Sequence, residues 1–128
     1  MTKPELAKAR GQHAKVIHDI DRLSSEQLTD WGPQPECTEG LSHSSGVLLY
    51  KGPDNKPESG FWQCTPGTWR LSIPRDDFCH FIAGEARYLS DNGETITVRA
   101  GTCVHFKAGW SGTCQVLSTL RNVYMLTA

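Results

Sequence analysis

The stretch RLSIPRDDFCHFIAG, residues 70–84, has the apolar alternation of a β-strand that enters a turn. It also carries Asp76, Asp77, Cys79 and His80, which are unusual in a strand expected to be buried. Carboxylate, thiol and imidazole groups bind metal ions and transfer protons. The stretch is therefore a metal site, a catalytic site or a strand with polar neighbours, and the flanking sequence helps to decide among them.

The sequence around this stretch consists almost entirely of short strand-like segments separated by turns. Asn92 and Gly93 tolerate the positive φ angles that a tight hairpin requires. Turn signals recur about every eight to twelve residues and no segment with helical periodicity interrupts them, which predicts an all-β sandwich or barrel. The expected strands are GVLLYKG (46–52), GFWQC (60–64), TWRLSI (68–73), DFCHFIAG (77–84), EARYLS (85–90), ETITVRAG (94–101), TCVHFKAG (102–109), GTCQVLSTL (112–120) and NVYMLTA (122–128).

Length and charge limit the classes of function. The chain has 128 residues, enough for one domain with its own core. Its 13 basic and 14 acidic residues form no long run of one sign, so neither nucleic acid nor a membrane surface is an expected partner. No apolar run approaches the roughly 20 residues that span a bilayer, and the first residues lack the apolar core of a secretory signal. We therefore expect a cytoplasmic protein.

The five cysteines are scattered, odd in number and never spaced as CxxC. In the cytosol this pattern predicts reduced thiols that pack as small hydrophobic side chains. The residues are Cys37, Cys64, Cys79, Cys103 and Cys114.

Residues 1–30 differ from the rest and are expected to form an N-terminal arm on a domain that spans residues 31–128. A short helix weakened at Gly11 is expected first, followed by an extended segment, KVIHDID (15–21). Ser24 and Gln27 then have the spacing of a capped helical turn. His13 and His18 have no partners at ligand spacing, so we expect them on the surface or at an edge.

From Ser59 to Leu126, about half of the chain, the order and spacing of the glycines, the hairpin and the terminal strand resemble a cupin. The likeness is closest to the single-domain cupins related to ureidoglycine aminohydrolase and to the ethanolamine-utilisation cupin, with LTDWGP (28–33) as a weaker match upstream. The resemblance implies an all-β cupin jelly-roll barrel that forms a homodimer. It favours a nitrogen-containing small metabolite as the ligand class.

The resemblance also identifies the positions at which cupins bind metal. With its last glycine at Gly84, the first cupin motif, G-x5-H-x-H-x3-E-x6-G, has Asp77 at its glutamate. Leu71 and Ile73 then occupy its two histidine positions, and Gly112 occupies the histidine of the second motif. None of these three residues donates a lone pair from its side chain, and one carboxylate cannot outcompete water for a divalent metal. We therefore expect no metal cofactor, while the narrower cupin group itself often departs from the histidine motif.

Strand alternation predicts which side chains share the interior with these positions. If Leu71, Ile73 and Asp77 face inward, then Trp69, Cys79 and Phe81 do too, whereas His80 and Asp76 face outward. Cys114 follows Gly112 inward by the same rule. Cys103 and His105 lie on one face of their strand and Val104 and Phe106 on the other, and alternation alone leaves open which face is inside. A zinc site rebuilt from Asp77, Cys79 and Cys114, with or without Cys103 and His105, stays an alternative.

Asp77 is the most informative of the predicted interior residues. A carboxylate in an apolar barrel must be hydrogen-bonded, paired with a cation or protonated. It is either a structural acid satisfied by Arg70, Arg75 or backbone amides, or a ligand-binding or proton-transfer group with a raised pKa.

We therefore predict a cupin that binds or turns over a small polar organic molecule, with Asp77 as the anchoring acid and His105 as a candidate acid or base. Two other classes stay open: a metal-dependent hydrolase or oxygenase with rebuilt ligands, and a structural or regulatory protein whose barrel is packed shut by Leu71, Ile73 and Phe81. The residues expected to line the ligand site are Trp69, Leu71, Ile73, Cys79, Trp110 and Cys114.

Overall fold

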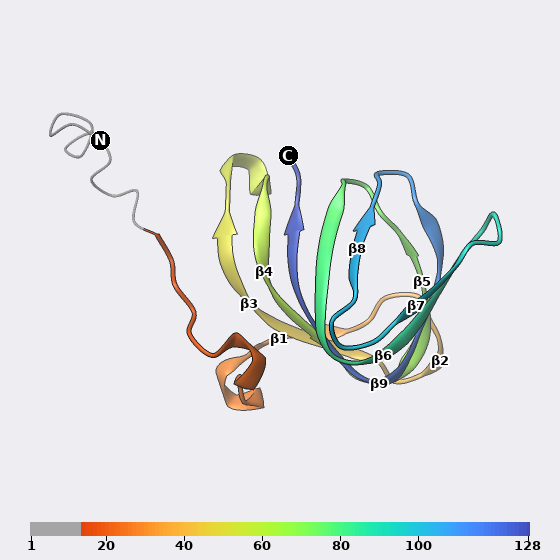
Figure 1. Cartoon of the computed structure of the whole chain (residues 1–128), viewed down its shortest axis with the longest axis horizontal. Helices are drawn as coiled ribbons and strands as arrows, with labels where there is room; N and C mark the ends of the chain where they lie inside the picture. The colour runs from red at the N-terminus through yellow and green to blue at the C-terminus, as the bar shows by residue number, and fades with distance from the viewer. Residues whose placement is uncertain (1–13) are drawn as a thin grey trace, which may run out of the picture.

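The computed structural model describes residues 14–128, which form one antiparallel sheet curled into a half-barrel (Figure 1). This confirms the predicted all-β fold. The strands are β1 (Thr29–Pro33), β2 (Cys37–Gly40), β3 (His43–Lys51), β4 (Glu58–Cys64), β5 (Gly67–Ser72), β6 (Asp77–Ser90), β7 (Thr95–Val98), β8 (Cys103–Phe106) and β9 (Ser111–Leu126). The helical elements of residues 14–128 are three short 3-10 turns, η1 (Ile20–Arg22), η2 (Ser25–Gln27) and η3 (Pro53–Asn55).

The two longest strands, β6 and β9, organise the sheet. They pair with each other from Asp77 and Leu126 at one end to Ser90 and Gly112 at the other. On the opposite edge of β9, β5 pairs with the first half and β4 with the second half. In Figure 1, β3 and β4 rise on one side of the end of β9, and β6 and β8 rise on the other side. The starts of β4 and β6 therefore lie beside the end of β9.

β6 and β9 are each longer than the sequence segments predict. Residues 77–84 and 85–90 were expected as two strands, but they form the single strand β6. The register against β9 shifts three times between Phe81 and Ala86, and Gly84 has a φ of 86°. Such bulges bend a strand without ending it, so the sheet curls while the pairing continues. The two strands expected at 112–120 and 122–128 likewise form one strand, β9. It begins at Ser111 and ends at Leu126, before the last two residues of the chain.

The core lies inside the curl, where alternate residues of the long strands are buried. Along β6, Cys79, Phe81, Ala86 and Tyr88 are buried, while His80 is exposed as predicted. Burying a large apolar side chain stabilises a fold by about 1.5–3 kcal/mol, so this alternation is enough to fix which face of the strand is inside. The fully buried large side chains include Phe61, Phe81, Leu120 and Val98.

Within residues 14–28, the segment around Leu23 contacts the sheet near Arg121 of β9. The backbone carbonyl of Leu23 accepts a hydrogen bond of 2.6 Å from Arg121 Nη2, and the Leu23 side chain is only 6% exposed. Gln27 accepts a 2.9 Å bond from the Ser24 backbone N–H, which confirms the predicted capped turn, here η2. The helix predicted before Gly11, and His13, lie outside the described residues.

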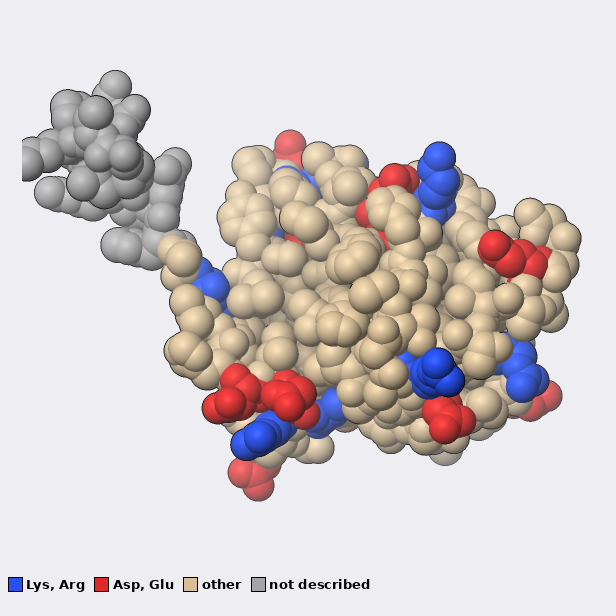
Figure 2. All heavy atoms as spheres, viewed as in Figure 1, with Lys and Arg blue, Asp and Glu red and all other residues tan. Residues whose placement is uncertain are grey.

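The distribution of surface charge and the state of the cysteines are as the composition predicts. In Figure 2, basic and acidic side chains are interspersed around the edge of the face in view, and its centre is uncharged. All five cysteines are free thiols, as the sequence predicts. Within residues 14–128, no helix is both long and apolar enough to cross a membrane.

Candidate functional site

A cavity of about 250 Å³ opens into the half-barrel and reaches Asp77 at the start of β6. A cavity of this size is smaller than the roughly 300–1,000 Å³ typical of sites for drug-sized ligands, so it suits a small molecule. Its walls come mainly from β4, β5, β6 and β9, with single residues from β1 and β8. The lining residues are Trp31, Glu58, Trp62, Trp69, Leu71, Ile73, Asp77, Cys79, Tyr88, Phe106, Asn122, Tyr124 and Leu126.

Asp77 is a carboxylate in the cavity wall with a raised pKa. Burial raises the pKa of its carboxyl group to about 6, although Cys79, His105 and Arg75 each favour the charged form. The raising effect therefore comes from removal of water, with a small addition from Glu58. A carboxyl group with this pKa changes its charge between mildly acidic and neutral pH.

Cys79 lies two residues farther along β6 on the same face. Its thiol donates a 3.5 Å hydrogen bond to Asp77 Oδ1. Burial raises the pKa of the Cys79 thiol, and the neighbouring Asp77 charge raises it further. Cys79 is therefore a protonated donor to the Asp77 carboxylate and not a thiolate nucleophile.

Glu58 and Tyr124 form the second polar group of the cavity. The Tyr124 hydroxyl donates a 2.6 Å hydrogen bond to Glu58 Oε2, and burial together with this bond raises the pKa of Tyr124. Gly60, the register partner of Tyr124, leaves room for this hydroxyl, because a Cβ at Gly60 would lie 3.1 Å from it. Outside the cavity lining, Lys51 Nζ lies 3.8 Å from Glu58 Oε1.

Two lining residues carry buried polar atoms without a hydrogen-bond partner in the described chain. These atoms are Oδ1 of Asn122 and the indole nitrogen of Trp69. The Trp69 N–H is close enough to Cys64 to lower that thiol's pKa slightly, but burial dominates and raises the Cys64 pKa to about 11. An unpaired buried polar atom costs about 1–3 kcal/mol, so Asn122 Oδ1 is an acceptor that a ligand can satisfy.

Aromatic rings form much of the remaining wall. The rings of Trp62 and Trp69 meet edge to face, with centroids 6.2 Å apart. Trp31, from the short strand β1, packs over Gly46 of β3, where any larger side chain would collide with its ring. The N-terminal strand thereby adds a third indole to the cavity.

Five of the predicted site residues line this cavity. They are Trp69, Leu71, Ile73, Asp77 and Cys79. Leu71 and Ile73, at the histidine positions of the first cupin motif, are therefore apolar walls of the cavity. The barrel is open as far as Asp77, which argues against the alternative of a barrel packed shut by Leu71, Ile73 and Phe81.

Cys114 and Trp110 do not line the cavity. Cys114 is fully buried in the core, and burial raises the pKa of its thiol to about 12. Trp110 packs edge to face on Phe106 and Tyr88, so it supports the wall from behind. The structure therefore does not bring these two residues to the cavity with the other predicted site residues.

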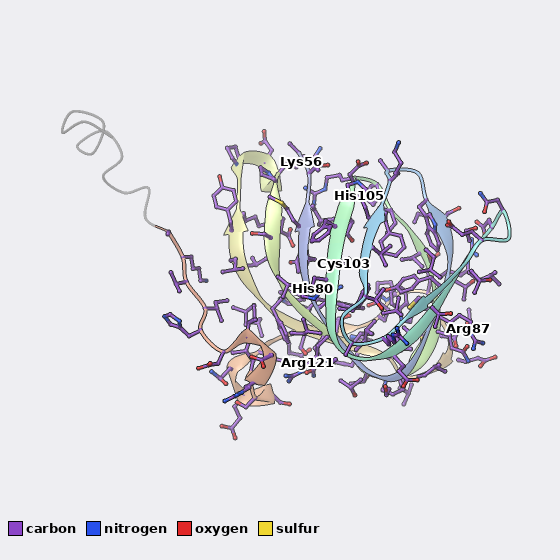
Figure 3. All side chains as sticks on the ribbon, viewed as in Figure 1. Lys56, His80, Arg87, Cys103, His105 and Arg121 are labelled. Carbon is purple, nitrogen blue, oxygen red and sulfur yellow. The ribbon has the colours of Figure 1, made fainter. Side chains whose placement is uncertain are left out.

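His105 lies on the outer face of the sheet, not in the cavity. The pairing of β8 with β6 directs Phe106 inward and leaves Cys103 and His105 exposed, together with His80 (Figure 3). His105 Nε2 lies 3.0 Å from Asp76 Oδ2, and the Ala108 N–H donates to Asp76 Oδ1 at 2.8 Å. These bonds lower the pKa of Asp76. Asp76 therefore binds His105 and the backbone of Ala108 and is not merely solvated.

The residues present do not fit the metal that cupins commonly bind. Among residues 14–128, no three His, Cys, Asp or Glu side chains gather closely enough to hold a metal ion. Cys114 lies outside the cavity lining, and Cys103 and His105 are exposed, so the rebuilt zinc set is not brought together.

Several lining residues were not predicted as site residues. Glu58 lies between the expected strands 46–52 and 60–64, although it starts β4. Asn122 and Tyr124 alternate in β9 with the more exposed Val123 and Met125. That alternation is visible in the sequence and was the available signal. Trp62 falls within the expected strand 60–64, and Trp31 lies at the expected start of the domain.

Comparisons with known proteins agree with this architecture. No curated protein matches the chain. A putative ethanolamine utilization protein Q from Salmonella typhimurium LT2 has a similar structure, with a TM-score of 0.60, 18% identity, and coverage of 75% of this chain and 76% of that one. The EutQ protein of Clostridium difficile matches with a TM-score of 0.57 at 15% identity, over 88% and 79% of the two chains.

A DUF861-family protein of unknown function from Pseudomonas syringae pv. tomato matches with a TM-score of 0.70 at 20% identity. The match covers 78% of this chain but only 44% of that one. At these identities the structural matches establish the fold alone. The family model of the EutQ-like cupin domain matches residues 51–124, more than half of the sequence. The chain therefore belongs to the family of EutQ-like cupin domains.

Proposed function

We propose that this cupin binds a small nitrogen-containing organic molecule in its cavity, with Asp77 as the polar anchor. The observation that carries the proposal is an opening of about 250 Å³ that ends on a partly buried carboxyl group. Ligand sites are typically apolar clefts with a few convergent polar groups, often with a perturbed pKa among them. Asp77, Glu58 and Asn122 among the aromatic walls match that description.

The nitrogen-containing ligand class is supported by the family. Two structures similar to this chain are named for ethanolamine utilization, and ethanolamine is a small amine. These names describe those proteins, and only the proposal extends the ligand class to this chain.

The proposed role of Asp77 is to bind the ligand's polar group. With a pKa of about 6, this carboxyl group is also the lining residue best suited to exchange a proton with a ligand near neutral pH. His105 lies outside the cavity, so we assign it no direct contact with the ligand.

A thermal-shift screen of the purified protein tests the proposal. The screen covers small amines, ureides, amides and carboxylates, and is run in parallel on Asp77→Asn and on Asp76→Asn. Asp76 is the matched control, since it is the adjacent carboxylate but faces the outer surface. A ligand at one hundred times its Kd stabilises the folded chain by about 2.7 kcal/mol, which such a screen detects readily.

We expect one ligand class to raise the Tm of the wild type and of Asp76→Asn, and to have a weaker effect on Asp77→Asn. A ligand response that Asp77→Asn leaves intact would disprove the role of Asp77. Absence of any response across the panel would count against small-molecule binding. Metal analysis of the same sample tests the metal-enzyme alternative, which requires near-stoichiometric zinc, iron, manganese or nickel.

A further inference from the structure

The hydrogen-bonding groups of the cavity wall are mostly acceptors, with the unpartnered indole N–H of Trp69 as a donor beside them. Glu58 and Asp77 contribute carboxyl oxygens, and Asn122 contributes an amide oxygen without a partner. The Tyr124 hydroxyl already donates its hydrogen bond to Glu58, so it can only accept hydrogen bonds from a ligand in the cavity. Among the described residues that line the cavity, none is lysine, arginine or histidine. A ligand that donates several hydrogen bonds is therefore favoured.

The two carboxyl groups lie on opposite sides of one position in the sheet. Glu58 of β4 and Asp77 of β6 are both register partners of Leu126 in β9. Neighbouring strands are about 4.8 Å apart, so the backbones of Glu58 and Asp77 are separated by about two strand spacings. A small group above Leu126 can therefore approach both carboxyl groups.

The aromatic residues complete the recognition chemistry. Trp31, Trp62 and Trp69 line the same cavity as the two carboxyl groups. The face of an indole ring attracts a cation by about 0.5–2 kcal/mol, and most strongly where water is excluded. The acceptors therefore favour a positively charged donor as the head group, and the indole rings offer a surface on which its carbon skeleton can pack.

We propose that the cavity selects a small protonated amine, with the ammonium group bound between Asp77 and Glu58 and the carbon skeleton against the tryptophan rings. This inference rests on the proposed function, because it names the charge class of the ligand of the same cavity. An ammonium ion has only donors and matches the acceptors. A carboxylate ligand would face two carboxyl groups, and a neutral amide would lack the charge-assisted hydrogen bonds that an ammonium group makes with them.

Four probes with one carbon skeleton isolate the head group: n-butylamine, butyramide, 1-butanol and butyrate. We expect n-butylamine to bind at pH 7.5 at least about tenfold more tightly than each of the other three, because a charge-assisted hydrogen bond contributes about 1.5–3 kcal/mol. A titration followed by ¹H–¹⁵N NMR measures weak binding and also locates it.

The four tryptophans provide an internal control for the location. The indole N–H signals of Trp31, Trp62 and Trp69 should shift on titration, while that of Trp110, outside the cavity lining, should shift least. Asp77→Asn is nearly isosteric and should weaken n-butylamine binding by about tenfold or more. Glu58→Gln should also weaken it, whereas Asp76→Asn should bind as the wild type does.

The outcomes separate this inference from the proposed function. Equal or tighter binding of butyramide, butanol or butyrate, with the same tryptophan shifts, would overturn amine selection and leave cavity binding intact. Failure of n-butylamine to bind would also overturn amine selection. The proposed function, binding of a small molecule in the cavity, would then be tested separately by the wider thermal-shift screen. Binding of n-butylamine with unchanged affinity in both Asp77→Asn and Glu58→Gln would place the amine elsewhere and reject the site.

Discussion

Glu58 and Asp77 flank Leu126 from the two strands on either side of β9, and both side chains line the same cavity. The two carboxyl groups come from positions far apart in the sequence, and the pairing of β4 and β6 with β9 brings them together. This relationship explains why the site contains two acids although the cupin motif accounts for only one. The charge of the cavity is also sensitive to pH, chiefly because burial raises the pKa of Asp77.

The pKa of Asp77 predicts how stability depends on pH. The pKa of about 6 in the folded chain exceeds the value of roughly 3.9 expected in the unfolded chain, so between these values the folded chain binds more protons. The free energy of unfolding should therefore fall as the pH rises from 4 to above 6, by about 2 kcal/mol from this residue, and then level off.

Urea unfolding at several pH values checks this prediction. Asp77→Asn should lose this part of the pH dependence, so its stability relative to the wild type should improve between pH 4.5 and 7.5. His105→Gln serves as the control, because His105 is near Asp77 but outside the cavity. The assignment fails if Asp77→Asn and the wild type have parallel stability profiles across this range.

Amine affinity should depend on pH in the opposite direction. Raising the pH from 5 to 7.5 ionises Asp77 while n-butylamine stays protonated, so binding should tighten, by up to about tenfold. Asp77 is influenced by Cys79 on its own strand, by Glu58, by His105 and by Arg75. Calorimetric titrations of the wild type, Asp77→Asn and His105→Gln distinguish these groups, because only Asp77→Asn should give a flat profile. A flat profile for His105→Gln would assign the effect to His105 instead.

The bend of β6 should require Gly84. Its φ of 86° is unfavourable for other residues, and a Cβ at this position would collide with the backbone carbonyl of Thr119. Gly84→Ala should therefore reduce the free energy of unfolding by more than the roughly 1 kcal/mol expected from strain alone. Gly93→Ala is the matched control, with a φ of 96° and no atom within 4 Å of the added Cβ. Chemical denaturation of both variants measures the difference, and equal losses would contradict the close contact.

The packing of the arm should depend on Leu23. The side chain is 6% exposed, so Leu23→Ala should destabilise the chain by about 2–3 kcal/mol and speed proteolysis within residues 14–28. Val16→Ala, at a position that is 64% exposed, should change neither property. Limited proteolysis followed by mass spectrometry measures the cleavage rate. Equal rates for the two variants would show that Leu23 does not anchor this segment.

Strand alternation made a substantial part of the cavity predictable. The cupin resemblance implied that Leu71, Ile73 and Asp77 face inward, and alternation along the strands added Trp69 and Cys79, because successive side chains of a strand point to opposite faces. The same reasoning placed His80 outside. The predicted homodimer and the cytoplasmic location remain predictions.

Other assignments depended on which strands are neighbours. Alternation groups Cys103 with His105 and Val104 with Phe106, but the register of β8 against β6 decides that Phe106 faces the core. Cys114 is buried inside the fold, as expected, yet it does not line the cavity. Periodicity specifies a face of a strand and carries no information on depth.

The sequence by itself determined the all-β class, because this depends on strand alternation and turn residues, and through the resemblance to cupin motifs it also predicted the loss of the cupin histidines and the inward position of Asp77. Only the tertiary structure decided that Glu58, Tyr124 and Asn122 share a cavity with Asp77. Their proximity results from hydrogen-bond registers between β4, β9 and β6, which join residues some tens of positions apart. Such long-range pairings are selected by the burial of the whole sheet face, which no single segment encodes.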